Sequence, residues 1–445
     1  INYNFDERYL FEANLRADAS SRIAQENRTT FLPSFSVGWR ISEEAFFPDN
    51  NILSTLKIRG SWGQLGNQGA LTNFNYTALI DLSASTPIIG GTPRLGGAQT
   101  RMANRDIKWE TTETTNIALD ATFFRNRLGL TAELYNRLTR DILVAVTIPT
   151  STGLRPPTQN AGTVRNSGYE LALNWKDDIG EFKYGARFNF HDNINEVTNL
   201  NGLPELPPSN DQITRLGEPI NSLYGLNVLR FYTEDDFNTD GSLKEGVPSS
   251  FSNVRPGDFL YEDIDGNNVI NDDDRQILGN GIPRMNWGLD LYASYSGFDL
   301  SVSFLGVGKR DVVLKRFIGY PLINESAWST LFEWQLEDYW TPQNKDARFS
   351  RFEDGLNRVN NFRVNSRYIF DASYFRVRNI TLGYTLPNQL TSKIGIASFR
   401  IFISGQNLFT VSNLPKGIDP LIPFNTSGNF YPVTAVYTGG LSLNF

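Results

Sequence analysis

The segment DIDGNNVINDDD at residues 263–274 carries oxygen donors at a regular spacing. The candidate ligands are Asp263 at loop position 1, Asp265 at 3, Asn267 at 5, the carbonyl of Val269 at 7, Asn271 at 9 and Asp274 at 12. Hard oxygen ligands in this order suit Ca²⁺, with Asn271 acting through its side chain or a water molecule. We expect calcium here to order a long loop, because no nucleophile or general base accompanies the motif.

This motif departs from the usual calcium loop, which has Gly at position 6 and Glu at position 12. Here Gly266 stands at position 4 and Asn268 at position 6, an arrangement closer to the dockerin variant. Asn tolerates the left-handed backbone that the turn needs, so the turn is retained. The alternative is an Asx-rich surface turn that binds no ion, and the sequence leaves both interpretations open.

Other reactive residue types are scarce in the 445-residue chain. It has no Cys, one His and two Met, which excludes disulfides, thiolate metal sites and a Cys nucleophile. The net charge of −7 argues against a nucleic-acid partner. Glu43 and Glu44 form a carboxylate pair, but nothing places them across a substrate, so we expect a solvated loop there.

The elements around the acidic motif are predicted to be β-strands with two different faces. In YLFEANLRAD, residues 9–18, the apolar side chains alternate with polar ones of both charge signs. The side-chain period of a strand is two, so these sets lie on opposite faces. If the apolar face meets lipid, Tyr9, Phe11 and Leu15 face the bilayer, and Glu12 and Arg16 face a wet lumen.

The same alternation recurs along the chain and predicts roughly 12–14 strands of about ten residues, the length of a tilted membrane strand. Short turns such as RNR at 125–127 and DDIGE at 177–181 join the strands in pairs. A helix is expected only near 326–340. Long segments separate the pairs, at about 64–110, 144–166, 196–222, 232–283 and 306–371. Short turns on one side and long loops on the other are typical of an outer-membrane barrel. A soluble all-β protein with one polar face is the alternative.

Aromatic residues make up 13% of the chain, and several fall in the long loops. We expect them to pack the loops together, although rings of this kind also stack on sugars. The loop aromatics in question are Tyr224, Phe231, Tyr232, Trp328, Trp334, Tyr339 and Trp340.

Several motifs, spread in order over nearly the whole chain, resemble those of one family, the SusC-like (RagA-like) TonB-dependent outer-membrane transporters. They are ERYLFEANLRADASSRI, FLPSFSVGWRISEEAFF, LKIRGSWGQLGNQ, IKWETTETTNIALDATFFRNRLGLTAELYNRLTRDIL, NAGTVRNSGYELAL, SYFRVRNITLGYTLP, ISGQNLFT and GIDP. The departures, such as Ala19 where the family has Gly and Trp62 where it has Tyr, touch no chemistry.

The resemblance implies an all-β fold: a transmembrane antiparallel outer-membrane β-barrel with long extracellular loops. Residues 1–445 would supply the C-terminal 12–14 strands of a barrel of about 22 strands. The family's plug domain, its TonB-binding box and the N-terminal strands of the barrel are absent from this chain.

The resemblance also implies a role. Family members import oligosaccharides or peptides across the bacterial outer membrane, together with a SusD-like surface lipoprotein. Energy comes from TonB, which would act through the missing N-terminal region, and the barrel contacts lipid and lipopolysaccharide. This role involves no covalent chemistry, so the resemblance implies no enzyme activity. Two other roles remain open at this point. One is a SusC-like barrel that serves as a structural or secretion-complex subunit, and the other is a soluble secreted carbohydrate-binding protein with a calcium loop.

Overall fold

The structure, a computed structural model, forms two compact units. The first comprises residues 1–177, 185–207 and 214–220, and the second comprises 178–184, 208–213 and 221–445. The described residues are 1–48, 50–71, 73, 76–145, 149–209, 211–251, 253–321, 331–352, 358–426, 428 and 430–445.

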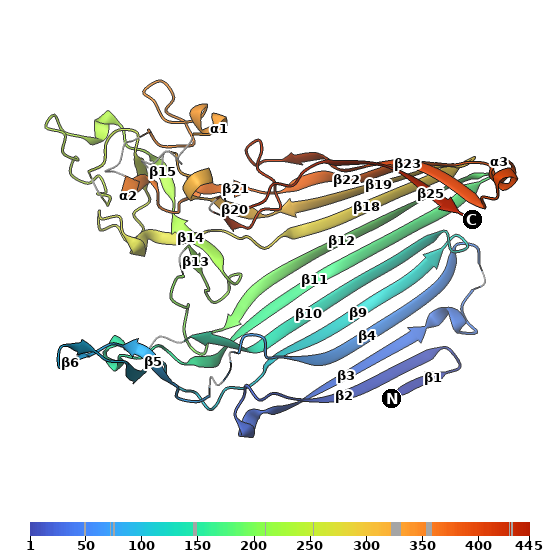
Figure 1. Cartoon of the computed structure of the whole chain (residues 1–445), viewed down its shortest axis with the longest axis horizontal. Coiled ribbons are helices and arrows are strands. Elements are labelled where there is room, and N and C mark those ends of the chain that lie inside the picture. Colours follow the sequence, from blue (N-terminus) through green and yellow to red (C-terminus); the bar gives the residue numbers. More distant parts are fainter. Residues whose placement is uncertain are drawn as a thin grey trace. The chain divides into compact units, whose positions relative to one another are not determined.

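The first unit is built around a run of long neighbouring strands, which lie side by side in Figure 1. Every pairing from β1 to β11 is antiparallel, as the hairpin connections predict. In order across the sheet the strands are β1 (Asn2–Phe5), β2 (Tyr9–Ala19), β3 (Thr29–Arg40), β4 (Leu53–Asn67), β9 (Glu110–Phe123), β10 (Leu128–Ala145), β11 (Thr158–Ile179) and β12 (Phe182–Asn199).

The second unit contains a similar antiparallel run. Its strands, in order, are β18 (Arg284–Tyr295), β19 (Phe298–Lys309), β22 (Tyr374–Thr385), β23 (Ser398–Ser412) and β25 (Val436–Asn444). Among the described residues there are thus 13 strands of this kind, within the predicted 12–14.

Several strands are longer than predicted. β10 and β12 have 18 residues each and β11 has 22, against the ten or so that cross a bilayer. The prediction of a loop over 144–166 was wrong in its second half, because β11 begins at Thr158 and pairs with β10 as far as Ala145. The short turns were predicted correctly in position. At the β9–β10 turn Phe124, Arg125 and Asn126 have positive φ, as Gly180 has at the next turn.

The long connections carry small elements of their own. In the first unit these are β5 (Ile80–Ser85), β6 (Ile88–Ile89), β7 (Thr92–Pro93) and β8 (Gly96–Gln99). In the second they are β13 (Gln212–Ile213), β14 (Ser222–Leu226), β15 (Val228–Phe231), β16 (Phe259–Tyr261), β17 (Arg275–Gly279), β20 (Asp311–Leu314), β21 (Ile369–Asp371) and β24 (Asn425–Thr426).

Helices are short. The α-helices are α1 (Glu333–Leu336), α2 (Arg358–Asn361) and α3 (Asn388–Thr391). The 3-10 turns are η1 (Gln25–Asn27), η2 (Ile41–Glu43), η3 (Thr150–Thr152), η4 (Glu234–Asp236), η5 (Asp272–Asp274), η6 (Arg316–Ile318), η7 (Ser366–Tyr368) and η8 (Ser392–Ile394). The helix expected over 326–340 is only one turn, α1, and residues 322–330 lie outside the described residues. No helix in the described part of the chain is long and apolar enough to cross a membrane.

The largest hydrophobic core belongs to the loops of the second unit and not to a sheet face. Its fully buried members come from β14, β16, β20 and the segment around η7, and they include Leu223, Phe259, Tyr261, Val313 and Tyr368. We call this cluster the loop core. It explains why such long connections are ordered, since apolar burial offsets the conformational entropy lost when they fold.

Candidate functional site

One face of the first unit's sheet is apolar and exposed. Strand register aligns one residue from each of six strands in a single row across this face: Phe11, Val37, Gly60, Ile117, Leu134 and Tyr169. Ile117 and Leu134 are 61% and 64% exposed. An apolar surface of this extent on a monomer marks a lipid or partner interface, and the outer surface of a membrane barrel requires it.

The opposite face is polar and carries an ion-pair network. The Arg59 guanidinium lies 3.1 Å from a carboxylate oxygen of Asp120 and 2.7 Å from one of Glu133. Thr131 adds a hydrogen bond to Asp120 of 3.0 Å. Charged and polar side chains on this face fit the polar interior of an outer-membrane barrel. The prediction of one apolar and one polar face is confirmed for these strands.

The acidic motif brings three of its six candidate ligands together. One carboxylate oxygen from each of Asp263, Asp265 and Asp274 lies within 4.8 Å of the others. Backbone N–H groups already hold Asp263, because Gly266 and Asn268 donate to its two oxygens at 2.9 and 2.8 Å. The three carboxylates are therefore positioned by the turn itself.

The side chains of two further candidates, Asn267 and Asn271, form hydrogen bonds inside the turn. The Asn267 amide donates to Asp265 at 2.7 Å, and its oxygen accepts the Val269 N–H at 2.6 Å. Asn271 accepts the N–H of Asp273 at 2.5 Å and so caps η5. The expected left-handed backbone is present, with φ of 60° at Asn268. The geometry is that of a preformed acidic turn whose amide side chains form hydrogen bonds within the turn.

Asp274 is fully buried, which the sequence pattern did not indicate. Its oxygens accept the N–H groups of Ile264 and Asn271 at 2.9 and 2.7 Å. A buried carboxylate is costly unless it is hydrogen-bonded, and these two donors satisfy it. Ser249 holds the same turn from outside through its backbone, which pairs with Asn268 and Ile270.

The prediction that the loop aromatics pack the loops is confirmed for the described residues. Tyr224, Phe231 and Tyr232 are buried, and Tyr232 is fully so. The rings of Trp334, Tyr339 and Trp340 are partly buried against the loop core. Trp328 lies outside the described residues.

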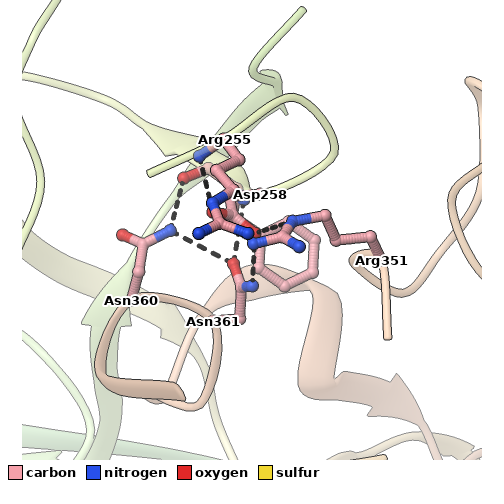
Figure 2. A network of polar contacts seen from close by, with 6 residues as sticks. Arg255, Asp258, Arg351, Asn360 and Asn361 are labelled. Atoms are coloured by element: carbon pink, nitrogen blue, oxygen red, sulfur yellow. Dashed lines mark hydrogen bonds and ion pairs between the residues drawn. The ribbon is translucent and has the colours of Figure 1, made fainter. Parts of the chain in front are cut away.

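A buried polar network joins three segments of the loops and was missed by sequence reasoning. Figure 2 shows Arg351 and Asn361 pointing toward the carboxylate of Asp258, which is fully buried. Each donates a hydrogen bond of 2.8 Å to one oxygen, while the backbone N–H of Arg255 donates 2.8 Å to the other. Asn360 donates to Asn361 at 3.1 Å and completes the network. Asp258 lies 93 residues from Arg351 and 103 from Asn361, so no local pattern could reveal the network.

The expectation of a solvated carboxylate pair was wrong for Glu44. Its side chain is only 12% exposed, whereas that of Glu43 is 44% exposed. The hydroxyl of Tyr9 donates to Glu44 at 2.6 Å and the indole N–H of Trp39 donates at 3.0 Å. Glu44 thus belongs to the end of the apolar face and not to a free loop.

These features define a class of protein. Long antiparallel strands with an exposed apolar face and a charged inner face, joined by short turns at one end and structured loops at the other, are those of an outer-membrane β-barrel. A soluble sandwich would cover the row through Ile117 and Leu134 with a second layer.

Within that class, the family model described as "TonB dependent receptor-like, beta-barrel" matches residues 1–307. The chain belongs to this family, is SusC-like, and is an outer-membrane protein. This finding excludes the soluble secreted alternative.

Relatives and solved structures agree with the family assignment. TonB-dependent receptor P3 of Formosa agariphila is 30% identical over 467 residues, covering 100% of this chain and 45% of that protein. TonB-dependent receptor SusC of Bacteroides thetaiotaomicron is 30% identical over 456 residues, covering 100% and 43%. The structure of the RagAB peptide transporter superposes with a TM-score of 0.81 at 26% identity and covers 100% of this chain and 47% of that chain. The chain thus spans less than half the length of the relatives it matches.

Proposed function

We propose that the chain forms part of the barrel wall of a TonB-dependent importer that takes up oligosaccharides or peptides across the outer membrane. The observation that carries the proposal is the match of the entire chain to the RagAB peptide transporter, with a TM-score of 0.81. The relative named SusC supports the same class. The polar face with its Arg59 network would line the path, and the exposed apolar face would meet lipid. No covalent chemistry is required, so no enzyme activity is proposed.

The proposed partners follow from the same relatives. A SusD-like surface lipoprotein would dock on the long loops, and TonB would supply energy through regions outside residues 1–445. The loop core supports this proposal physically, because a docking surface needs rigid loops, and its buried aromatics together with the Asp258 network provide rigidity.

The test is uptake by cells that carry or lack the complete gene. Labelled maltooligosaccharides and labelled peptides longer than porins admit are supplied separately, with and without an uncoupler of the proton-motive force. The proposal predicts uptake of one class, lost on gene deletion and on uncoupling. Unchanged uptake of both classes after deletion, with the barrel present in wild-type membranes, would contradict it.

A second role, a structural or secretion-complex subunit, predicts a different result. Deletion would then leave uptake intact and would change the assembly or cargo of another outer-membrane complex. Purification of the complete protein from membranes under mild detergent separates the two. A lipoprotein partner favours import, and a secretion assembly favours the alternative.

We further propose that the acidic turn binds calcium, which would order the loop. The support is the convergence of the Asp263, Asp265 and Asp274 carboxylates within 4.8 Å, a repulsive arrangement that a hard cation would neutralise. The amide side chains of Asn267 and Asn271 are engaged elsewhere, so these three carboxylates and the Val269 carbonyl are the residues that would hold the ion.

A further inference from the structure

Glu44 has one carboxylate oxygen engaged and one with room for another donor. Both hydrogen bonds, from the Tyr9 hydroxyl and the Trp39 indole, go to Oε1. Among the described residues, the nearest charged partner of Oε2 is Arg8, whose Nη1 lies 3.7 Å away, beyond hydrogen-bond distance. A carboxylate accepts up to about four hydrogen bonds, so Oε2 retains capacity for a donor.

Two exposed aromatic side chains, Tyr9 and Trp39, contact the carboxylate. Tyr9 and Trp39 are 47% and 39% exposed and pair with each other across β2 and β3 on the apolar face. Phe5 lies 6.3 Å from Tyr9 between ring centroids, and Phe46 is exposed nearby in the chain. Hydrogen bonds from Tyr9 and then Trp39 hold the pKa of Glu44 below its ordinary value, so it is ionised at neutral pH.

This cluster lies at the short-turn end of the strands. The segment after Arg40 leads into β4, whose first residue, Leu53, pairs with Phe123 beside the β9–β10 turn. In outer-membrane barrels the short turns are periplasmic, and aromatic residues lie there at the level of the lipid headgroups. The Glu44 carboxylate is therefore placed where inner-leaflet headgroups lie.

The net charge of the residues around Glu44 indicates which lipid headgroup would bind there. Residues 6–8 and 40–44 contain two arginines, Arg8 and Arg40, and four acids, which gives a net charge of −2. The four acids are Asp6, Glu7, Glu43 and Glu44. This balance favours a cationic group and disfavours an anionic lipid. A shallow groove of about 340 Å³ beside the cluster is lined by Tyr9, Phe11, Val37, Trp39 and Ile58, among others, and is mostly apolar.

We propose that Glu44, Tyr9 and Trp39 form a binding site for a phospholipid whose headgroup carries a primary ammonium, that is, a phosphoethanolamine lipid. The ammonium donates to Glu44 Oε2 and lies against the aromatic rings, as cations do on such faces. The phosphate lies toward Arg8, and an acyl chain follows the apolar groove. This proposal depends on the location of the protein in the outer membrane and does not depend on which substrate it transports.

The test uses the complete protein in nanodiscs of phosphatidylethanolamine, phosphatidylcholine and phosphatidylglycerol in equal parts, with native mass spectrometry of the lipids retained after detergent release. The wild type should retain on the order of tenfold more phosphatidylethanolamine than phosphatidylcholine. The reason is that the ammonium of phosphatidylcholine cannot donate a hydrogen bond. Phosphatidylglycerol should be retained least.

Glu44→Gln should strongly reduce this preference, because a neutral amide oxygen accepts a weaker hydrogen bond from the ammonium than a carboxylate does. Glu43→Gln, a matched change in the same segment, should leave it intact. Heat-modifiable mobility on gels confirms that each variant is folded. Trp39→Phe keeps the carboxylate and replaces the indole with a smaller ring, so it should lower the lipid preference only partly. Equal retention of the three lipids by the wild type, or an undiminished preference in folded Glu44→Gln, would overturn the proposal.

Discussion

Arg400 reaches across an intervening strand to form a two-point ion pair with Asp299. Its Nε and Nη2 lie 2.8 and 2.5 Å from the two carboxylate oxygens. β23 carries Arg400 and β19 carries Asp299, while β22 lies between them. The crossing is made at Gly383, where an added Cβ would lie 2.4 Å from Arg400 Nη2 and 2.5 Å from Asp299 Oδ1. The missing side chain therefore makes room for the ion pair.

Gly383→Ala should separate Arg400 from Asp299 and lower the free energy of unfolding by about 1 kcal/mol or less, because the pair is partly exposed. Gly439→Ala in β25 is the matched control, since a Cβ there meets nothing within 4 Å. Urea titrations in the same detergent compare the two. Equal effects of the two substitutions would show that the ion pair contributes nothing at this crossing.

A charge on the apolar face should be far more costly than the same charge on the polar face. Ile117→Arg puts a guanidinium among lipid chains and should destabilise the barrel by about 2–4 kcal/mol if the site lies near the bilayer midplane. Gly60 is the cross-strand neighbour of Ile117, and Ser61, the next residue in β4, lies on the polar face. Ser61→Arg should therefore cost much less. Folding titrations in lipid vesicles measure the difference, and similar losses for both would mean that both faces contact water.

Calcium binding at the acidic turn is tested by calorimetry on the complete protein. The wild type should release heat with calcium and gain protection of the loop from proteases. Asp263→Asn keeps an oxygen acceptor for only one of the Gly266 and Asn268 N–H groups and removes a charge, so it should weaken binding at least severalfold. Asp273→Asn changes an exposed neighbour outside the cluster and should leave calcium binding unchanged. No heat from the wild type at millimolar calcium would leave only the Asx-rich turn.

The segment that contains β15 and the η4 turn should be acid-sensitive. Two hydrogen bonds from Arg230, of 2.6 and 2.7 Å, hold the pKa of Asp236 at about 2, below its ordinary 3.8. Because the pKa is lower in the folded state, the stabilisation is fully present above the ordinary pKa and is lost as the pH falls through about 2.

Amide exchange of residues 228–247 should therefore accelerate between about pH 4 and pH 2. Asp236→Asn should remove this local pH response, while Asp235→Asn, its exposed neighbour, should retain it. A response that survives in Asp236→Asn would assign the acid sensitivity to another group.

Local patterns predicted what depends on local geometry. The alternation in LGLTAELYNR placed Leu134 and Glu133 on opposite faces correctly, because the pleat enforces a period of two. The spacing of acids also found the turn at 263–274. The ends of β11 were missed, since pairing with β10 and not hydrophobicity extends it. The environments of Glu44 and Asp258 were missed because Tyr9 and Arg351, which donate to them, lie 35 and 93 residues away and meet them only after folding.

The claim that the two sheet faces meet lipid and a wet lumen is tested most directly by single-cysteine labelling, to which residues 1–445 contribute no background Cys. Cysteines at Phe11, Leu15, Leu119, Leu171 and Phe188 form one set, and cysteines at Glu12, Arg16, Asp120, Glu170 and Arg187 form the other. In membranes, a water-soluble maleimide should label the second set and spare the first, while a fluorophore at the first set should be quenched by brominated lipid. Labelling of the first set with protection of the second would contradict the account.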